Sequence, residues 1–188
     1  MLKTVGIILL CVFAAITALS WYAGIFDRID ISYGEVDPYP LIYREHRGSY
    51  EGFRFVMNDV YRYVRDSLSL STDTGFAVFY DNPSKTATDS LRSICGIILS
   101  DTAAVKKPYK KTTSLKTDAV VGQYCLRSFF SYMTGSYKFY EKSARYIKEN
   151  KLVQNGPVLE IYDLKHRRIR YIAPCGTGVT PLPVFSGD

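Results

Sequence analysis

The sequence predicts an α/β (α+β) domain in which a β-α-β-β order occurs twice, preceded by one transmembrane helix. Three observations lead to this prediction: an uncharged apolar stretch at the N-terminus, two later segments with helical spacing of apolar residues, and β-strand patterns around each of them. Neither half would bury both faces of its strands alone. We therefore expect the halves to share one antiparallel-rich sheet with both helices on one side.

The composition is that of a folded chain with room for one domain. Of its 188 residues, 47% are hydrophobic and 22% charged, a balance that excludes a mainly disordered protein. We predict an anchor over residues 4–26, a domain over 29–175 and a short tail over 176–188. The net charge of +6 fits an anionic lipid surface, nucleic acid or solubility alone, and does not distinguish among them.

Residues 4–26 are predicted to form a membrane anchor. They carry no charge and would span about 34 Å as a helix, which matches the hydrocarbon thickness of a bilayer. Lys3 precedes this span, and Trp21 and Tyr22 lie near its other end, where aromatic side chains prefer the membrane interface. A cleaved signal peptide is the alternative, because residues 18–20 fit a cleavage site. The uncharged residues beyond that site favour a retained anchor.

The charges that flank the anchor are nearly balanced and do not set its orientation. Cys95, Cys125 and Cys175, which follow the anchor, are widely spaced and odd in number, a poor disulfide framework. Asn82 precedes Pro83 and is therefore no glycosylation acceptor. Both features favour a cytosolic domain.

The first half of the domain begins with β-leaning residues 29–40 and a strand over 41–50 that closes in a glycine turn. A helical period follows, and the residues of its apolar face, which we expect in the core, are Phe53, Met57, Val60, Val64 and Leu68. Residues 75–83 and 95–100 predict two further strands, the second apolar enough to lie inside a sheet.

The second half follows a polar, Lys-rich connection over residues 101–117. Strand formers return at 118–129, and two more strands are predicted at 157–164 and 169–174. Between them a helix is predicted over 136–152 with Ser136 as its N-cap. The face expected to be buried consists of Tyr137, Tyr140, Ala144 and Ile147.

The sequence contains no motif of the common catalytic classes. It has two histidines, His46 and His166, and no nucleophile elbow, Walker loop or zinc-hydrolase motif. Three isolated cysteines do not form a metal site. We therefore predict no catalytic residue, no metal and no cofactor, and a protein that is not an enzyme; a His–Cys pair formed in space would be the exception.

Glu160 is the candidate for ligand binding. It alternates with apolar neighbours, so it should face the same way as Tyr162 and opposite to Leu159 and Ile161. If Leu159 and Ile161 face the helices, Glu160 lies on an open, concave sheet face, where a carboxylate among aromatic rings would suit an amine or other cation. The alternative is a solvated residue paired with Lys or Arg. The candidate ligand-binding residues are Glu160, Tyr162, Tyr50 and Tyr80.

Two basic segments are candidate contacts for an anionic leaflet. Each of their charges would contribute about 1 kcal/mol to membrane binding near the surface. A nucleic-acid patch and ordinary solvated loops are the alternatives. The basic residues of the first segment are Lys106, Lys107, Lys110, Lys111 and Lys116. Those of the second, around a predicted hairpin turn, are Lys165, His166, Arg167, Arg168 and Arg170.

The segments REHRGSY, VFYDNP, GIILS, YIKENKL and PVLEIYD follow one another as in GyrI-like domains, and residues 29–174 resemble that family. The resemblance implies the duplicated β-α-β-β fold. It also implies a single-pass protein of the endoplasmic reticulum membrane, with its domain in the cytosol as an adaptor or receptor in selective autophagy of that organelle. In drug-binding bacterial relatives an acidic residue of the matching E-I-Y strand helps to hold cationic ligands, and Glu160 has that position.

The resemblance further implies a long acidic tail with an aromatic-x-x-aliphatic motif that binds autophagy modifier proteins. This sequence ends at Asp188, soon after the domain. Residues 26–29 and 39–42 fit the loose pattern, but the first abuts the bilayer and the second enters a predicted strand, so we expect neither to bind. The leading expectation is a membrane-anchored adaptor for cytosolic proteins. A membrane-tethered module for a small cationic ligand, and an enzyme with a lipid-borne or electrophilic substrate, are the alternatives; nucleic acid is not expected as a partner.

Overall fold

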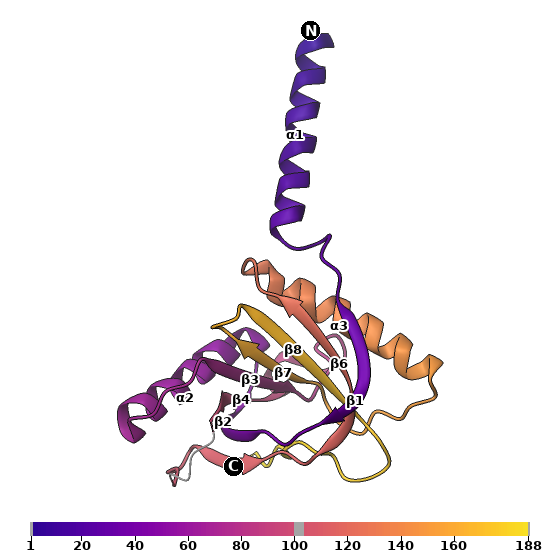
Figure 1. The fold of residues 1–188 in the computed structure, drawn as a ribbon. Coiled ribbons are helices and arrows are strands. Elements are labelled where there is room, and N and C mark those ends of the chain that lie inside the picture. The colour runs from indigo at the N-terminus through magenta and orange to yellow at the C-terminus, as the bar shows by residue number, and fades with distance from the viewer. Residues whose placement is uncertain (1, 100–103, 188) are drawn as a thin grey trace.

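The computed structural model describes residues 2–99 and 104–187, and its N-terminal helix α1 (Leu2–Tyr22) projects away from the rest of the chain (Figure 1). Within these residues, one helix, Lys3–Tyr22, is long and apolar enough to cross a membrane, with a mean hydropathy of 2.2 and none of it buried. Length and composition alone support this, and a signal sequence shares both. The helix ends four residues before the predicted span does, because Gly24 adopts a φ of 75° in the turn that follows.

Eight strands of the described chain form a single sheet in the order β1-β6-β8-β7-β3-β4-β2-β5. Each pairing between these strands is antiparallel. The strands are β1 (Asp30–Val36), β2 (Pro40–Arg47), β3 (Thr74–Phe79), β4 (Arg92–Ile98), β5 (Lys110–Thr113), β6 (Thr117–Cys125), β7 (Leu159–Asp163) and β8 (Arg168–Cys175). Two short 3-10 helices occur at Tyr50–Gly52 and Thr88–Ser90.

The predicted duplication is confirmed by the order of the elements. With helices α2 (Phe53–Leu68) and α3 (Phe130–Glu149), the units β2-α2-β3-β4 and β6-α3-β7-β8 have the same plan, and β3 and β7 join them at the centre of the sheet. Helix α2 packs on β2, β3 and β4, and α3 on β1, β6 and β8, on the same side of the sheet (Figure 1). Each helix therefore covers its own half.

The apolar face predicted for α2 is confirmed. Val60 and Val64 are fully buried against Ile42 and Ile97, and the rest of the predicted stripe packs on the core with partial exposure. Burial of such side chains stabilises the contact by about 1.5–3 kcal/mol each. This face could be predicted from the sequence because its side chains are large and apolar and recur at helical spacing.

The prediction for α3 was wrong in its start and in part of its buried face, of which Ile147 does pack on the core. The helix begins at Phe130, and the Ser136 hydroxyl donates to the carbonyl of Tyr132 inside the helix, so Ser136 is no N-cap. Tyr137 is 72% exposed, and Ala144 is exposed as well. The residues that face the sheet are instead Ser131, Gly135, Phe139 and Ser143. At Gly135 the rings of Tyr171 and Tyr124 occupy the space beneath the helix, so a Cβ atom would not fit there.

The second face of the sheet is covered by the chain's C-terminal part, which contradicts the expected open, concave face. Leu182 and Phe185 of the segment predicted as a short tail pack on a buried cluster that includes Phe76 and Leu159. The Leu115 amide also donates to the carbonyl of Pro181. Both faces are therefore occupied. Three predicted segments extend outside the described residues. These are the strand over 95–100 at Ser100, the connection over 101–117 at residues 101–103, and the tail over 176–188 at Asp188.

The turn after α1 is fastened to the domain through α3 and β6. The Lys138 ammonium donates to the carbonyls of Gly24 and Ile25 at 2.9 and 2.7 Å, and also to that of Asp27. The Thr134 hydroxyl donates to the carbonyl of Ala23, and the Tyr124 hydroxyl to that of Gly24. Helix α1 thus leaves the domain from a fixed point on α3.

Candidate functional site

Glu160 lies on β7 at the centre of the sheet and points toward the helices. Its neighbours Leu159 and Ile161 face the other side, where they join the cluster covered by Leu182. The expected alternation is present, but the condition for Glu160 to lie on an open face is not met, since Leu159 and Ile161 do not face the helices. Glu160 is consequently 3% exposed and lies beneath α3.

The carboxylate of Glu160 is held by hydroxyl groups. Tyr162 donates to Oε2 at 2.8 Å, while the hydroxyls of Ser136 and Tyr140 lie at 3.4 and 3.5 Å. The Tyr171 hydroxyl is 3.4 Å from that of Ser136 and extends the network. Among the residues that the structure describes, no Lys, Arg or His pairs with Glu160.

Burial raises the pKa of Glu160 to about 7, although hydrogen bonds from Tyr162, Ser136 and Tyr140 act in the opposite direction. Burial also raises the pKa of Tyr162 and Tyr140 well above the usual value for tyrosine, and the neighbouring carboxylate adds to this. The tyrosine hydroxyls therefore remain protonated donors near neutral pH. Glu160 itself changes charge in the physiological range.

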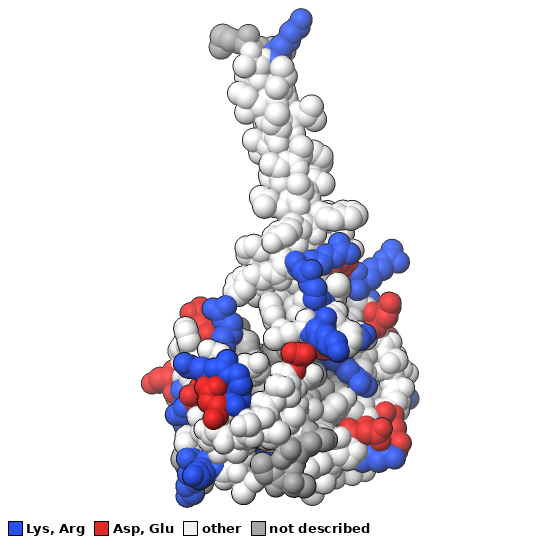
Figure 2. Space-filling view, turned by 60° about the vertical axis from the view of Figure 1, so that its left-hand side comes forward, with Lys and Arg blue, Asp and Glu red and all other residues white. Residues whose placement is uncertain are grey.

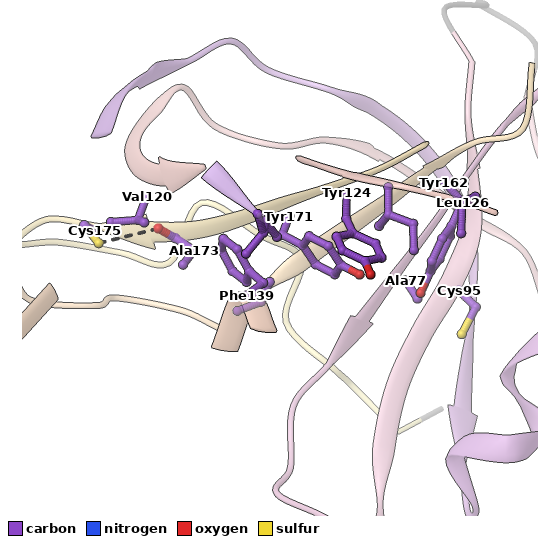
Figure 3. Close-up of a cluster of buried hydrophobic side chains, with 13 residues drawn as sticks. Ala77, Cys95, Val120, Tyr124, Leu126, Phe139, Tyr162, Tyr171, Ala173 and Cys175 are labelled. Atoms are coloured by element: carbon purple, nitrogen blue, oxygen red, sulfur yellow. Dashed lines mark hydrogen bonds between the residues drawn. The ribbon is translucent and has the colours of Figure 1, made fainter. Parts of the chain in front are cut away.

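Aromatic rings fill the space around the carboxylate. The ring of Tyr162 lies between Phe53 of α2 and Tyr132 of α3, with centroid distances of 6.1 and 5.7 Å. Tyr171 stacks on Phe139 at 4.9 Å, and Figure 3 shows this pair in a row of buried side chains that leads to Tyr162. The site is thus a tyrosine-filled polar centre within the core.

A hollow of about 240 Å³ is lined in part by Tyr132. Its lining residues are Leu126, Arg127, Ser128, Tyr132, Leu164 and Arg167. Tyr132 also contacts the ring of Tyr162, which in turn donates to Glu160. Glu160 is not among the residues that line the hollow.

The other two predicted ligand-binding residues lie apart from Glu160. Tyr50 packs on Phe79 at 4.7 Å and donates to the carbonyls of Asp81 and Arg92, so it borders the same aromatic cluster. Tyr80 lies on the opposite face, where its hydroxyl donates to the carbonyl of Pro183 at 2.6 Å. Tyr80 is not part of the site, because its side chain lies on the face of the sheet opposite to that of Glu160.

Sequence reasoning missed most of the residues that surround Glu160. The positions that α3 contributes, Tyr132, Ser136 and Tyr140, are spaced four residues apart and lie on one helical face. This spacing was detectable, but the predicted helix began too late to include Tyr132. In β8, Tyr171 lies two residues from Ile169 and from Ala173, so its own strand face is apolar.

The two basic segments lie on different strands of the sheet. Lys110 and Lys111 lie on the edge strand β5, and Lys110 pairs with Glu45 at 2.9 Å. Arg168 and Arg170 lie on β8, where they line a hollow of about 710 Å³ together with Arg28. Lys106 and Lys107 precede β5, Arg167 ends the turn before β8, and Lys116 pairs with Glu35.

The histidines have ordinary partners. A ring nitrogen of His46 lies 3.1 Å from the carbonyl oxygen of Ser49, and His166 lies 2.8 Å from Asp163. Burial raises the pKa of the Cys95 thiol to about 12, which makes it a poor nucleophile at neutral pH. In the described part of the chain, no His–Cys pair and no group of potential metal ligands is present.

No protein-family model matches this chain, and no curated protein matches it by sequence. Solved structures match it by fold. The C-terminal domain of EcmrR is 9% identical, with 80% of this chain and 99% of that one covered and a TM-score of 0.60. A hydrolase from Listeria innocua is 10% identical, with 78% and 92% covered and a TM-score of 0.53.

A further solved structure contains a ligand. SAV2435 bound to tetraphenylphosphonium is 13% identical to this chain, with 79% and 94% covered and a TM-score of 0.52. Identities this low show a common fold and do not transfer activity. With its duplicated β-α-β-β plan and these neighbours, the domain has the GyrI-like fold.

Proposed function

We propose that this domain binds an amphipathic organic cation at Glu160, in a protein that α1 holds at a membrane. The observation that carries the proposal is a buried carboxylate without a cationic partner in the described chain. A buried charge is costly unless it is paired, and a bound cation would supply the missing partner. The surrounding tyrosine rings would add cation–π attraction.

The aromatic filling of the site sets the kind of ligand. A cation entering between α2 and α3 has to displace or stack on Tyr132 and Tyr162, which favours a ligand with large apolar or aromatic groups. Tetraphenylphosphonium has this character, and a structural neighbour binds it.

Titration of the full chain in nanodiscs with tetraphenylphosphonium tests this function. Binding is expected at pH 8 and should weaken as the pH falls below about 7, up to tenfold per pH unit, because protonation of Glu160 removes the charge that attracts the cation. Empty nanodiscs correct for partitioning into lipid. Tetraphenylborate, which has the same shape and opposite charge, is the control. Equal binding of both ions, or none at pH 8, contradicts the proposal.

We further propose that the protein is single-pass in the endoplasmic reticulum membrane, with its domain in the cytosol and with a binding rather than a catalytic role. The resemblance to membrane-anchored GyrI-like proteins, in particular testis-expressed protein 264, supports a second function as an adaptor in selective autophagy of that organelle. The specific observation in its favour is the tyrosine-filled centre, because an adaptor needs no open pocket.

The adaptor function predicts capture of autophagy modifier proteins by the full chain in detergent, above the level of a chain-free control resin. No capture would contradict a direct receptor role. A glycosylation acceptor placed near Asp188 should remain unmodified in microsomes, since the proposed domain faces the cytosol. Its modification would place the domain in the lumen and exclude cytosolic partners.

A further inference from the structure

We propose that the domain docks on an anionic bilayer through a surface at the start of α3, beside the anchor. We call this the docking surface, and its residues are Arg54, Arg127, Phe129, Phe130, Met133 and Arg167. The inference rests on the proposed membrane anchoring by α1 and is independent of ligand binding at Glu160. It assigns the membrane as a direct partner of the folded domain as well as of α1.

The apolar part of the docking surface is exposed. Phe129, Phe130 and Met133 are 59%, 53% and 70% exposed, and they lie at the end of α3 that follows β6. Phe130 and Met133 are on the helix face opposite Gly135 and Phe139, which contact the sheet. A cluster of large apolar side chains at this end of a helix suits insertion at the level of the lipid headgroups.

Arginines flank these apolar side chains. The guanidinium of Arg54 lies 5.2 Å from the ring centre of Phe129, and that of Arg127 lies 6.0 Å from Trp21 at the end of the anchor. Arg127 also pairs with Asp27 at 3.1 Å, and Arg167 donates to the carbonyl of Arg127. Arginine suits lipid phosphates because its planar fork donates two hydrogen bonds to one group.

The position of the docking surface relative to the bilayer follows from the turn after α1. Thr134 and Lys138 of α3 hold the carbonyls of Ala23 and Gly24, which directly follow the aromatic residues at the end of the anchor. Figure 1 shows α3 starting directly beneath the end of α1, while the C-terminal segment runs along the far end of the domain. Continuity with the anchor thus brings the docking surface to the headgroup region.

Charge on the domain agrees with this orientation. Figure 2 shows lysine and arginine side chains gathered on the part of the domain directly below α1, with few acidic ones between them. Two residues of the docking surface, Arg127 and Arg167, also line the hollow beside Tyr132, together with Ser128. Its two arginines and hydroxyl suit an anionic headgroup, and its Leu126 and Leu164 suit the adjoining glycerol or acyl carbons.

Tryptophan quenching by brominated lipids tests the docking surface. Trp21 is the single tryptophan. A full-length double variant with Trp21→Phe and Phe130→Trp therefore has its one tryptophan in α3, and its fluorescence reports on α3 alone. In vesicles that contain phosphatidylserine, brominated phosphatidylcholine is expected to quench this tryptophan strongly. The matched control carries Trp21→Phe with Val179→Trp, a position 81% exposed in the C-terminal segment, and is expected to stay unquenched.

A second comparison tests the arginines. Adding Arg54→Gln and Arg167→Gln leaves the Arg127–Asp27 pair intact and is expected to reduce quenching at residue 130 to the level seen in vesicles of phosphatidylcholine alone. Absence of quenching at residue 130, or equal quenching at residue 179, overturns the inference. If the chain does not float with vesicles in a density gradient, the membrane anchoring on which the inference rests is contradicted. The titration with tetraphenylphosphonium tests the function of Glu160 separately.

Discussion

Replacing Glu160 with glutamine is expected to abolish binding of tetraphenylphosphonium and, at the same time, to stabilise the domain at pH 8. Glutamine keeps the shape of the side chain and removes the charge. In the native protein this charge is 3% exposed and has tyrosine and serine hydroxyls as its partners, so its ionisation opposes folding. The same charge is what a cationic ligand would require.

The pH dependence of stability follows from the two pKa values of Glu160. Its pKa is about 7 in the folded protein, against the ordinary glutamate value of 4.5 in the unfolded chain. Below pH 4.5 both states bind the proton, and Glu160 does not reduce the stability. Between pH 4.5 and 7 the unfolded chain loses the proton first, so the free energy of unfolding falls, in total by roughly 3 kcal/mol, and it stays level at higher pH.

Urea unfolding of the full chain in nanodiscs between pH 4 and pH 8 measures this effect. The Glu160→Gln variant should lack the decline and should therefore exceed the native protein in stability at pH 8 while matching it near pH 4. Glu141→Gln, which removes an exposed carboxylate of α3, is the control and should leave the profile unchanged. Parallel profiles for Glu160→Gln and the native chain, or undiminished cation binding, would count against the assignment of Glu160.

The two helices show which structural features the sequence could reveal. The face of α2 was predicted because its inward residues, such as Val60 and Val64, are large and apolar. Most of the face of α3 was missed because Gly135 and Ser143 carry no hydrophobic signal, although Ile147 packs on the core as predicted. A Cβ atom at Gly135 would lie 2.6 Å from the Tyr171 hydroxyl, so this position requires glycine for close packing.

The orientation of Glu160 could not be predicted because both faces of its strand are buried. The alternation of Leu159, Glu160 and Ile161 defines two faces, but which of them meets the helices depends on contacts far away in sequence. The decisive contact is the C-terminal segment, where Leu182 covers the face that carries Leu159 and Ile161. That segment contains no strand or helix in the described chain, and its sequence predicted a short tail.

Gly96→Ala is expected to cause the largest loss of stability in the sheet. Gly96 lies in β4 opposite Tyr43 of β2, and a Cβ atom there would overlap the carbonyl oxygen of Ile42 and lie 2.7 Å from the Tyr43 Cα. Both obstacles are backbone atoms, so no side chain can move to make room. Strand β2 has to shift away from β4, at an expected cost of about 3 kcal/mol in the free energy of unfolding.

The effect should extend to the candidate site through α2. Val60 and Val64 pack on Ile42 of β2 and Ile97 of β4, so displacement of β2 loosens the helix that presents Phe53 to Tyr162. Thermal unfolding should show a lower Tm, and tetraphenylphosphonium binding should weaken in the molecules that remain folded. Gly34→Ala in β1, where a Cβ atom meets nothing within 4 Å, is the matched control. Equal Tm values for the two variants would contradict the close approach of β2 and β4, and with it the role of the sheet in positioning α2 over Glu160.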